Sequence, residues 1–226
     1  MCENQEKNGI VQYLMLTFLI AWGIEAVIIA GERFEILTGV IGSTLIFLLI
    51  GLGAGFAPAY AVCILLKKQR KIHGLKDILR LTLQPVMIIG GGIEEFGWRG
   101  FLQPQMEKKF PFAISALIVG VIWGCWHLPL WLVQTSNQSS MHFLSFLCYC
   151  ITFSFVLGLL YRLTRSTLAC IMLHAWGNTL QSMFTRSTLI DPVSVKTAAI
   201  WGTEILIVIL VSFLIDRLQK VENSYE

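Results

Sequence analysis

The sequence predicts an all-α protein: a polytopic membrane helical bundle with about seven transmembrane helices. Hydrophobic residues make up 55% of the 226 residues and charged residues 14%, and the mean hydropathy is +0.70. A soluble domain carries about a quarter charged residues, so this composition excludes a soluble globular protein. The apolar segments are long and do not alternate in polarity with a period of two, which favours helices over a barrel of strands.

Seven apolar segments have lengths close to the roughly 20 residues that cross a hydrocarbon core about 30 Å thick. We place them at residues 10–30, 36–66, 83–106, 112–134, 142–161, 167–185 and 197–215. The first exceeds a signal-peptide core and lacks a strongly cationic preface, so it is expected to be a retained span. The second is the longest and is expected to bend at a cluster of helix-weakening residues. These residues are Gly51, Gly53, Gly55 and Pro58.

One membrane domain is expected over residues 1–226, with a motif-bearing core at about 83–185, because no linker or internal repeat divides the series. The net charge of +3 is too small to indicate a nucleic-acid partner. The cysteines lie mostly inside apolar runs and have no zinc-site spacing, so they are expected to be small buried hydrophobic residues. Membrane lipids are the expected surroundings.

Ionisable residues inside a span cost at least about 2.5–3.5 kcal/mol on insertion scales, so each needs a partner, a cavity or a function. Glu95 and Arg99 are four residues apart, which places them on one helical face where they can pair. Glu94 points away from both and has no cationic neighbour on its helix. It is therefore a candidate general base. Alternatively, the three residues form a buried ionic cluster that joins helices.

Three further polar residues lie in the later spans. His127 stands in a span that is otherwise uncharged, just before Pro129, and His174 shares a helical face with Asn178. Each is explained separately as a packing residue that hydrogen-bonds between helices. Their depths, however, coincide with that of Glu94, at about 10–16 Å from the same side when each residue rises 1.5 Å along antiparallel spans. One shared site is therefore predicted.

Such a site suits peptide hydrolysis. Glu94 would deprotonate a water molecule, while His174 and Asn178 would donate hydrogen bonds to the tetrahedral oxyanion. His127 would hold the water or protonate the leaving amine. Glu95 and Arg99 would support the helix that carries Glu94.

Two other interpretations use the same polar residues. Glu94, His127 and His174 form a possible ligand set for one divalent metal such as zinc, although a metal-free arrangement is slightly favoured. A proton or cation path is the other interpretation, with Glu25 and Glu204 as additional path residues. Outside that interpretation Glu25 and Glu204 have no assigned role, and they pair with each other or with an arginine, or lie near an interface.

Three motifs, in this order along the chain, resemble those of the CAAX prenyl protease and bacteriocin-processing family of intramembrane endopeptidases. The run Glu94-Glu95-Phe96-Gly97-Trp98-Arg99 resembles the family's EExxxR motif. Trp123-Gly124-Cys125-Trp126-His127 is similar to its Phe-x-x-x-His motif, and His174-Ala175-Trp176-Gly177-Asn178 to its His-x-x-x-Asn motif. Trp123 replaces the usual phenylalanine, which is expected to affect only the shape of the cavity.

The resemblance implies helices around an active site within the bilayer, with Glu94, His127, His174 and Asn178 as catalytic residues. Family members have been described both as metalloproteases and as glutamate-dependent proteases, so the cofactor stays open. The implied substrate is a short peptide or a lipidated protein. A small chain resembles the bacterial members, which favours a bacterial cell membrane. The alternative is a non-proteolytic protein of bacteriocin self-immunity or a membrane scaffold.

Overall fold

The structure of the protein is a computed structural model that describes residues 2–68, 92–180 and 186–222. The described residues form helices and no strands. Five helical segments among them are long and apolar enough to cross a membrane, which confirms the all-α membrane bundle. They are Gly9–Arg33, Gly39–Lys67, Phe112–Leu132, Phe143–Thr164 and Val195–Leu218. The other two predicted spans, 83–106 and 167–185, lie partly outside the described residues.

The second apolar segment is bent as predicted. The helices α2 (Gly39–Leu48) and α3 (Ala57–Lys68) are separated by a π-helical stretch, η1 (Leu49–Ala54). At its end the amide of Gly55 donates to the carbonyl of Ile50, five residues earlier, at 2.7 Å. Glycines and a following proline weaken the regular helical ladder, so the bend falls where they cluster.

The first motif lies in a short broken helix rather than in the interior of a span. In the described part, the predicted segment 83–106 becomes α6 (Glu95–Gly97), the π-helical η2 (Trp98–Leu102) and α7 (Gln103–Glu107). Glu94 therefore precedes the first helical residue, where its carbonyl accepts the amides of Gly97 and Trp98. The reason is Gly92, whose φ of 86° cannot be part of a right-handed helix.

The other two motifs lie on two central helices of the bundle. α8 (Phe112–Trp126) ends just before His127, and a 3₁₀ stretch, η3 (Leu128–Leu132), follows it, as expected from Pro129. α9 (Phe143–Thr164) packs closely on α8, where the Ser154 hydroxyl donates to the Ala116 carbonyl at 2.9 Å. α10 (Thr167–Leu180) has 14 residues, so its described part is shorter than a span.

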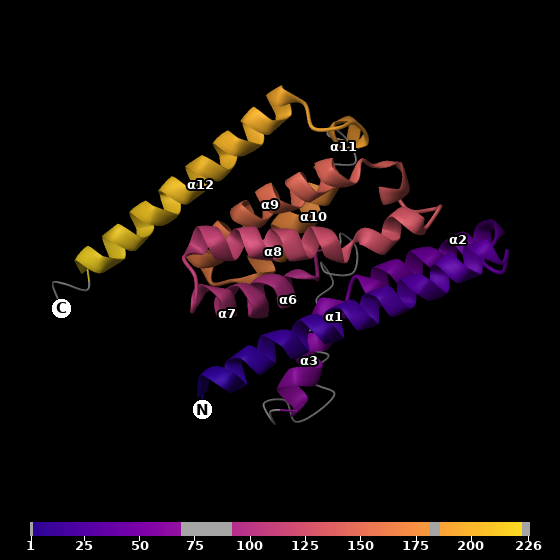
Figure 1. Cartoon of the computed structure of the whole chain (residues 1–226), viewed down its shortest axis with the longest axis horizontal. Coiled ribbons are helices and arrows are strands. Elements are labelled where there is room, and N and C mark those ends of the chain that lie inside the picture. Colours follow the sequence, from indigo (N-terminus) through magenta and orange to yellow (C-terminus); the bar gives the residue numbers. More distant parts are fainter. Residues whose placement is uncertain (1, 69–91, 181–185, 223–226) are drawn as a thin grey trace.

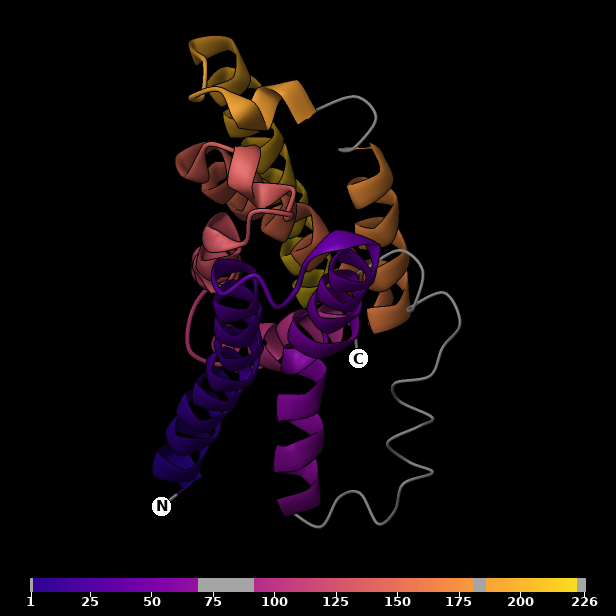
Figure 2. The same ribbon diagram turned by 90° about the vertical axis from the view of Figure 1, so that its right-hand side faces the viewer.

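The remaining helices lie on two sides of this central group. α1 (Cys2–Arg33), α2 and α3 lie together on one side, and α12 (Val195–Glu222) lies on the other, across α9 (Figure 1). The view in Figure 2 shows α1 beside the α2–α3 segment. Arg162 of α9 links the outer helix by pairing with Asp216 of α12 at 2.6 Å and with Glu107 of α7 at 3.4 Å. Two short helices are α11 (Arg186–Ile190) and the 3₁₀ turn η4 (Gln138–Ser140).

Candidate active site

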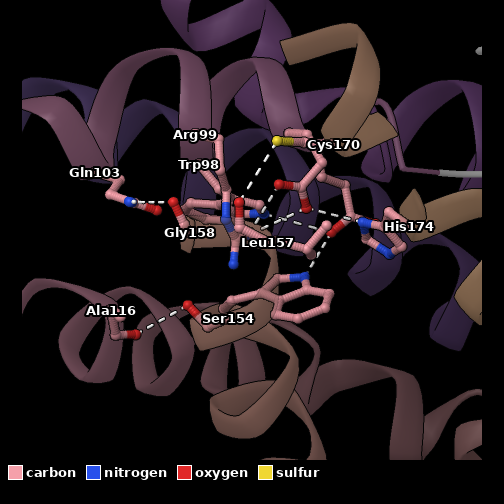
Figure 3. A network of polar contacts seen from close by, with 12 residues as sticks. Trp98, Arg99, Gln103, Ala116, Ser154, Leu157, Gly158, Cys170 and His174 are labelled. Carbon is pink, nitrogen blue, oxygen red and sulfur yellow. Dashed lines mark hydrogen bonds and ion pairs between the residues drawn. The ribbon is translucent and has the colours of Figure 1, made fainter. Parts of the chain in front are cut away.

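A buried charged group joins the first and third motifs. The Arg99 guanidinium donates to Oε1 of Glu95 at 3.1 Å and lies 3.0 Å from Oε2, and the Nδ1 atom of His174 lies 2.8 Å from the same Oε1. Glu95 and Arg99 are fully buried and His174 is 2% exposed. Figure 3 shows Arg99, Trp98 and His174 converging in this network. The predicted pairing of Glu95 with Arg99 is confirmed, whereas the bond to His174 was not expected.

Glycine at position 92 allows the chain to pass close to His174. A Cβ atom there would lie 2.9 Å from the Ile171 carbonyl and 3.0 Å from the His174 Cβ. On its other side, the His174 ring meets the ring of Trp123 edge to face, with centroids 5.1 Å apart. The imidazole therefore lies between the carboxylate of Glu95, the chain at Gly92 and the ring of Trp123.

Glu94 is held in a different way from its neighbour. Its Oε2 atom accepts the indole N–H of Trp123 at 2.6 Å and, more weakly, that of Trp98 at 3.4 Å. Its Oε1 atom has no hydrogen-bond partner among the described residues. The side chain is half-buried. One oxygen is thus anchored by neutral donors, and the other is available to a ligand.

His127 lies at the end of α8, beside Glu94. Its Nδ1 atom lies 2.9 Å from the Trp123 carbonyl, an acceptor, so we assign the hydrogen to Nδ1. In the neutral imidazole Nε2 then carries the lone pair. The Trp123 ring, whose N–H binds Glu94, meets the His127 ring edge to face, with centroids 5.9 Å apart. The second motif is therefore part of the same cluster.

Asn178 lies one helical turn after His174 on α10, as predicted from the spacing, and its side chain is half-buried. The Arg99 guanidinium also lies over the Trp123 ring, 5.6 Å from its centroid. Trp123 thus contacts both the Glu94 carboxylate and the charged group around Glu95. The residues of the three motifs form one network around this indole.

Residues that reasoning from the sequence missed are the two tryptophans and Gly92. Trp123 was expected to affect only the shape of the cavity, and that expectation is wrong, because its N–H binds the Glu94 carboxylate. A phenylalanine has no such donor. Trp98 lies one helical turn after Glu94, so the spacing alone indicates its contact. Nothing in the sequence indicates that Trp123 reaches across from another helix.

The described residues do not form a ligand set for the alternative metal site. Over the residues that the structure describes, no three His, Cys, Asp or Glu side chains come together in a way that would hold a metal ion. Glu94, His127 and His174 are close neighbours but do not form such a group. We therefore derive no chemical step through zinc or another divalent ion.

The two acidic residues without an assigned role lie far apart in the fold. Glu25 is buried on α1, at 1% exposure, and α1 lies on the opposite side of the central helices from α12 (Figure 1). Glu204 is exposed on α12. The expected pairing of Glu25 with Glu204 is wrong, since neither of these described residues contacts the other.

These features define a multi-pass membrane protein with a buried cluster of carboxylates, imidazoles and indoles at the meeting point of its central helices. Comparison with known proteins finds a family model that matches part of the chain. Residues 77–180 match the family model described as Type II CAAX prenyl endopeptidase Rce1-like. The match covers all three motifs and confirms the resemblance to the CAAX prenyl protease family over this segment.

Two curated proteins are similar to parts of the chain. The CAAX prenyl protease 2 of Methanococcus maripaludis is 28% identical over 53 residues, which are 24% of this chain and 20% of that protein. The lysostaphin resistance protein A of Staphylococcus haemolyticus is 30% identical over 139 residues, 59% of this chain and 37% of that protein. The chain thus spans about a fifth and just over a third of the lengths of these relatives. A bacterial relative agrees with the expected integral position in a bacterial cell membrane.

Proposed function

We propose that this chain is an intramembrane endopeptidase in which Glu94 activates the attacking water. The observation that carries the proposal is the asymmetric setting of that carboxylate. Two indole N–H groups bind Oε2, whereas Oε1 has no partner among the described residues. A general base must be fixed in position and yet have an oxygen within hydrogen-bond reach of the water. The family match supports the reaction class.

In the proposed reaction, Oε1 of Glu94 takes a proton from water while the water oxygen attacks the carbonyl carbon of the scissile peptide bond. The lone pair on Nε2 of His127 accepts the second O–H of this water and so orients it. When the tetrahedral intermediate collapses, the C–N bond breaks and Glu94 passes its proton to the leaving nitrogen. The carboxylate is then ready for another cycle.

The oxyanion is proposed to be stabilised from α10. Because Nδ1 of His174 donates to Glu95, Nε2 becomes a second donor only when the imidazole is protonated. The Asn178 amide is the other proposed donor, one turn away on the same helix. Arg99 and Glu95 form a neutral ion pair, so a proton on His174 would leave its positive charge available to the oxyanion.

The proposed substrate is a short peptide or the tail of a membrane-associated protein, lipidated or plain. The name of the Methanococcus relative supports a prenylated protein tail as one class. A buried site among apolar helices suits a substrate that reaches it from the lipid phase, because the peptide bond is then brought to water that the bundle encloses.

A direct test incubates the purified protein in lipid nanodiscs with prenylated and unprenylated peptides and identifies the products by mass spectrometry. Wild-type protein is expected to release one defined fragment, with or without a chelator. The Glu94→Gln variant is expected to release none while remaining folded. Equal cleavage by the two proteins, or none by wild type on any peptide, would overturn the proposal.

A second candidate is a non-proteolytic role in resistance or self-immunity, which the name of the Staphylococcus relative favours. Such a protein would act by binding its partner with the same helices. Cells that express the chain and are exposed to a lytic bacteriocin distinguish the two roles. Protection that survives Glu94→Gln favours binding, and protection lost together with peptide cleavage favours the endopeptidase.

A further inference from the structure

One end of the helix bundle is joined by a single arginine. Arg162, near the end of α9, lies 3.4 Å from Glu107 of α7 and 2.6 Å from Asp216 of α12. Its guanidinium also lies over the ring of Phe112, at the start of α8, 5.2 Å from the ring centroid. The ends of α7 and α9, the start of α8 and the C-terminal part of α12 therefore meet at one level of the bundle (Figure 1).

Three further cations surround this Arg162 network. They are Lys109 after α7, Arg165 after α9 and Arg217 on α12, each within three residues of a member of the network. All three side chains are exposed, and none of them forms an ion pair with an acid in the part of the chain that the structure describes. Lys108 differs, because it donates to the Gln105 amide oxygen at 3.0 Å. We call Lys109, Arg165 and Arg217 the basic surface.

Apolar side chains are exposed directly beside these cations. Phe110 is 39% exposed, Leu163 58% and Leu218 70%. The Arg217 guanidinium lies over the ring of Phe213, which is itself exposed, with 4.9 Å to the ring centroid. Cations and apolar groups that are exposed together at the ends of membrane-spanning helices suit the boundary between lipid headgroups and acyl chains.

The opposite end of the bundle has a different balance of charge. There the Glu32 carboxylate of α1 accepts the backbone amides of Gln134 and Thr135, which precede α9. Around the end of α1, α11 and the start of α12, acids and cations are equal in number: Glu32, Glu35 and Asp191 against Arg33, Arg186 and Lys196.

Cations exceed acids around the Arg162 network. Within three residues of its members there are five cations and two acids: Lys108, Lys109, Arg162, Arg165 and Arg217 against Glu107 and Asp216. Lysine and arginine in short loops are concentrated on the cytoplasmic side of membrane proteins. The charge difference between the two ends therefore favours the Arg162 end as the cytoplasmic one.

We propose that the basic surface binds the anionic headgroups of phospholipids in the cytoplasmic leaflet. Phosphate oxygens accept charge-assisted hydrogen bonds from ammonium and guanidinium groups. The exposed apolar neighbours favour a whole lipid over a soluble phosphate, because only the lipid offers acyl chains to cover them. Arg162 holds the helices together, since two acids already occupy its guanidinium. The three cations lie outside the motif network, so the proposal is independent of the endopeptidase.

Native mass spectrometry of the full chain measures the bound lipid directly. The purified protein is mixed with phosphatidylglycerol and phosphatidylcholine of equal chain length, and wild type is expected to retain more phosphatidylglycerol. Replacing the basic surface by Lys109→Gln, Arg165→Gln and Arg217→Gln together should lower this preference by about fivefold or more. The control replaces two cations of the opposite end, Arg33→Gln and Lys196→Gln, and should keep the preference. Thermal unfolding checks that both variants are folded.

Three results would overturn the proposed lipid surface. Wild type retains the two lipids equally, the triple variant keeps the preference, or the control variant loses it as fully. Inorganic phosphate is added in a further arm. We expect it to leave the lipid bound, and equal displacement by phosphate alone would show a site for a free anion instead.

The leaflet is tested by cysteine labelling with a membrane-impermeant maleimide, and peptide mass mapping separates the new cysteine from the native ones. Asn137→Cys, in the loop before α9, should be labelled in intact cells, whereas Lys109→Cys should be labelled only after the membrane is opened. The reverse pattern would overturn the cytoplasmic assignment. Neither measurement uses cleavage, so an inactive wild type with the expected lipid preference and labelling would refute the endopeptidase proposal alone.

Discussion

Two carboxylates that are adjacent in the chain, Glu94 and Glu95, lie in opposite surroundings. Glu95 is fully buried between the Arg99 guanidinium, which contacts both of its oxygens, and the His174 imidazole, which bonds to Oε1. Glu94 is half-buried and bound by neutral indoles through one oxygen alone. A carboxylate that is fully buried in an ion pair holds structure, whereas a half-buried one with an oxygen open to a ligand can exchange protons. From this comparison we propose the structural role for Glu95 and the chemical role for Glu94.

The largest effect is expected when Glu95 is removed. Glu95→Ala leaves Arg99 and His174 buried without their anion, which costs about 3–5 kcal/mol of unfolding free energy, and cleavage is lost with it. Thermal unfolding in detergent and the peptide assay measure both. Asp216→Ala is the matched control, because it breaks a partly exposed pair with Arg162, worth about 0–1 kcal/mol. Equal destabilisation by the two variants would contradict the assignment.

A smaller effect, confined to the chemical step, is expected from Trp123→Phe. The variant loses a hydrogen bond to a charged group, worth about 1.5–3 kcal/mol, so kcat should fall by about ten- to 100-fold. Trp131→Phe is a suitable control, since it also loses an indole bond, to the Met141 carbonyl at 2.7 Å, but away from Glu94. If both variants lower kcat alike, the bond from Trp123 does not position the base.

Gly92→Ala should destabilise the fold by about 1–3 kcal/mol, because a residue with a Cβ adopts a φ of 86° only under strain. The added methyl also presses on His174, so cleavage should fall even where the protein remains folded. Gly202→Ala on α12 is the control: its Cβ meets no atom within 4 Å, and alanine favours a helix. A stable, fully active Gly92→Ala variant would show that the turn tolerates a side chain.

The smallest effect is expected from Glu204→Gln. Glu204 is exposed on α12, away from Glu94 and Glu25, so cleavage should change by less than about twofold, within the ±0.5 kcal/mol usual for surface substitutions. The same variant examines the alternative of a cation path. An ion flux in proteoliposomes that depends on Glu204 would favour transport over hydrolysis.

The apolar runs were sufficient to predict most of the fold. Length and hydropathy located five spans within a few residues, and the glycines near Gly53 located the bend of the second. They did not predict the break before Glu94, because a run of apolar residues and glycines fits a continuous helix equally well. The deciding feature is the positive φ of Gly92, at a position where a Cβ atom would lie 3.0 Å from the Cβ of His174 on another helix.

Part of the site was also predictable from the sequence. Contacts within one helix follow from spacing, so the pair of Glu95 with Arg99 was correctly predicted. Contacts between helices depend on how each helix is rotated about its own axis. The sequence of a helix does not define that rotation. The bonds from Trp123 to Glu94 and from His174 to Glu95 are of this second kind. The predicted depths placed the polar residues of the three motifs in one layer of the membrane. Depth alone does not show which of their atoms are in contact.

The most direct test of the division between the two carboxylates is the cleavage rate of Glu94→Gln at an unchanged unfolding temperature. The amide preserves the shape of the side chain and an acceptor for the Trp123 indole, but it takes no proton from water. We expect kcat to fall by about 10²- to 10⁴-fold, the usual contribution of a general base, in a protein that unfolds like wild type. A folded Glu94→Gln variant that cleaves peptide at the wild-type rate would contradict the assignment of Glu94 as the base.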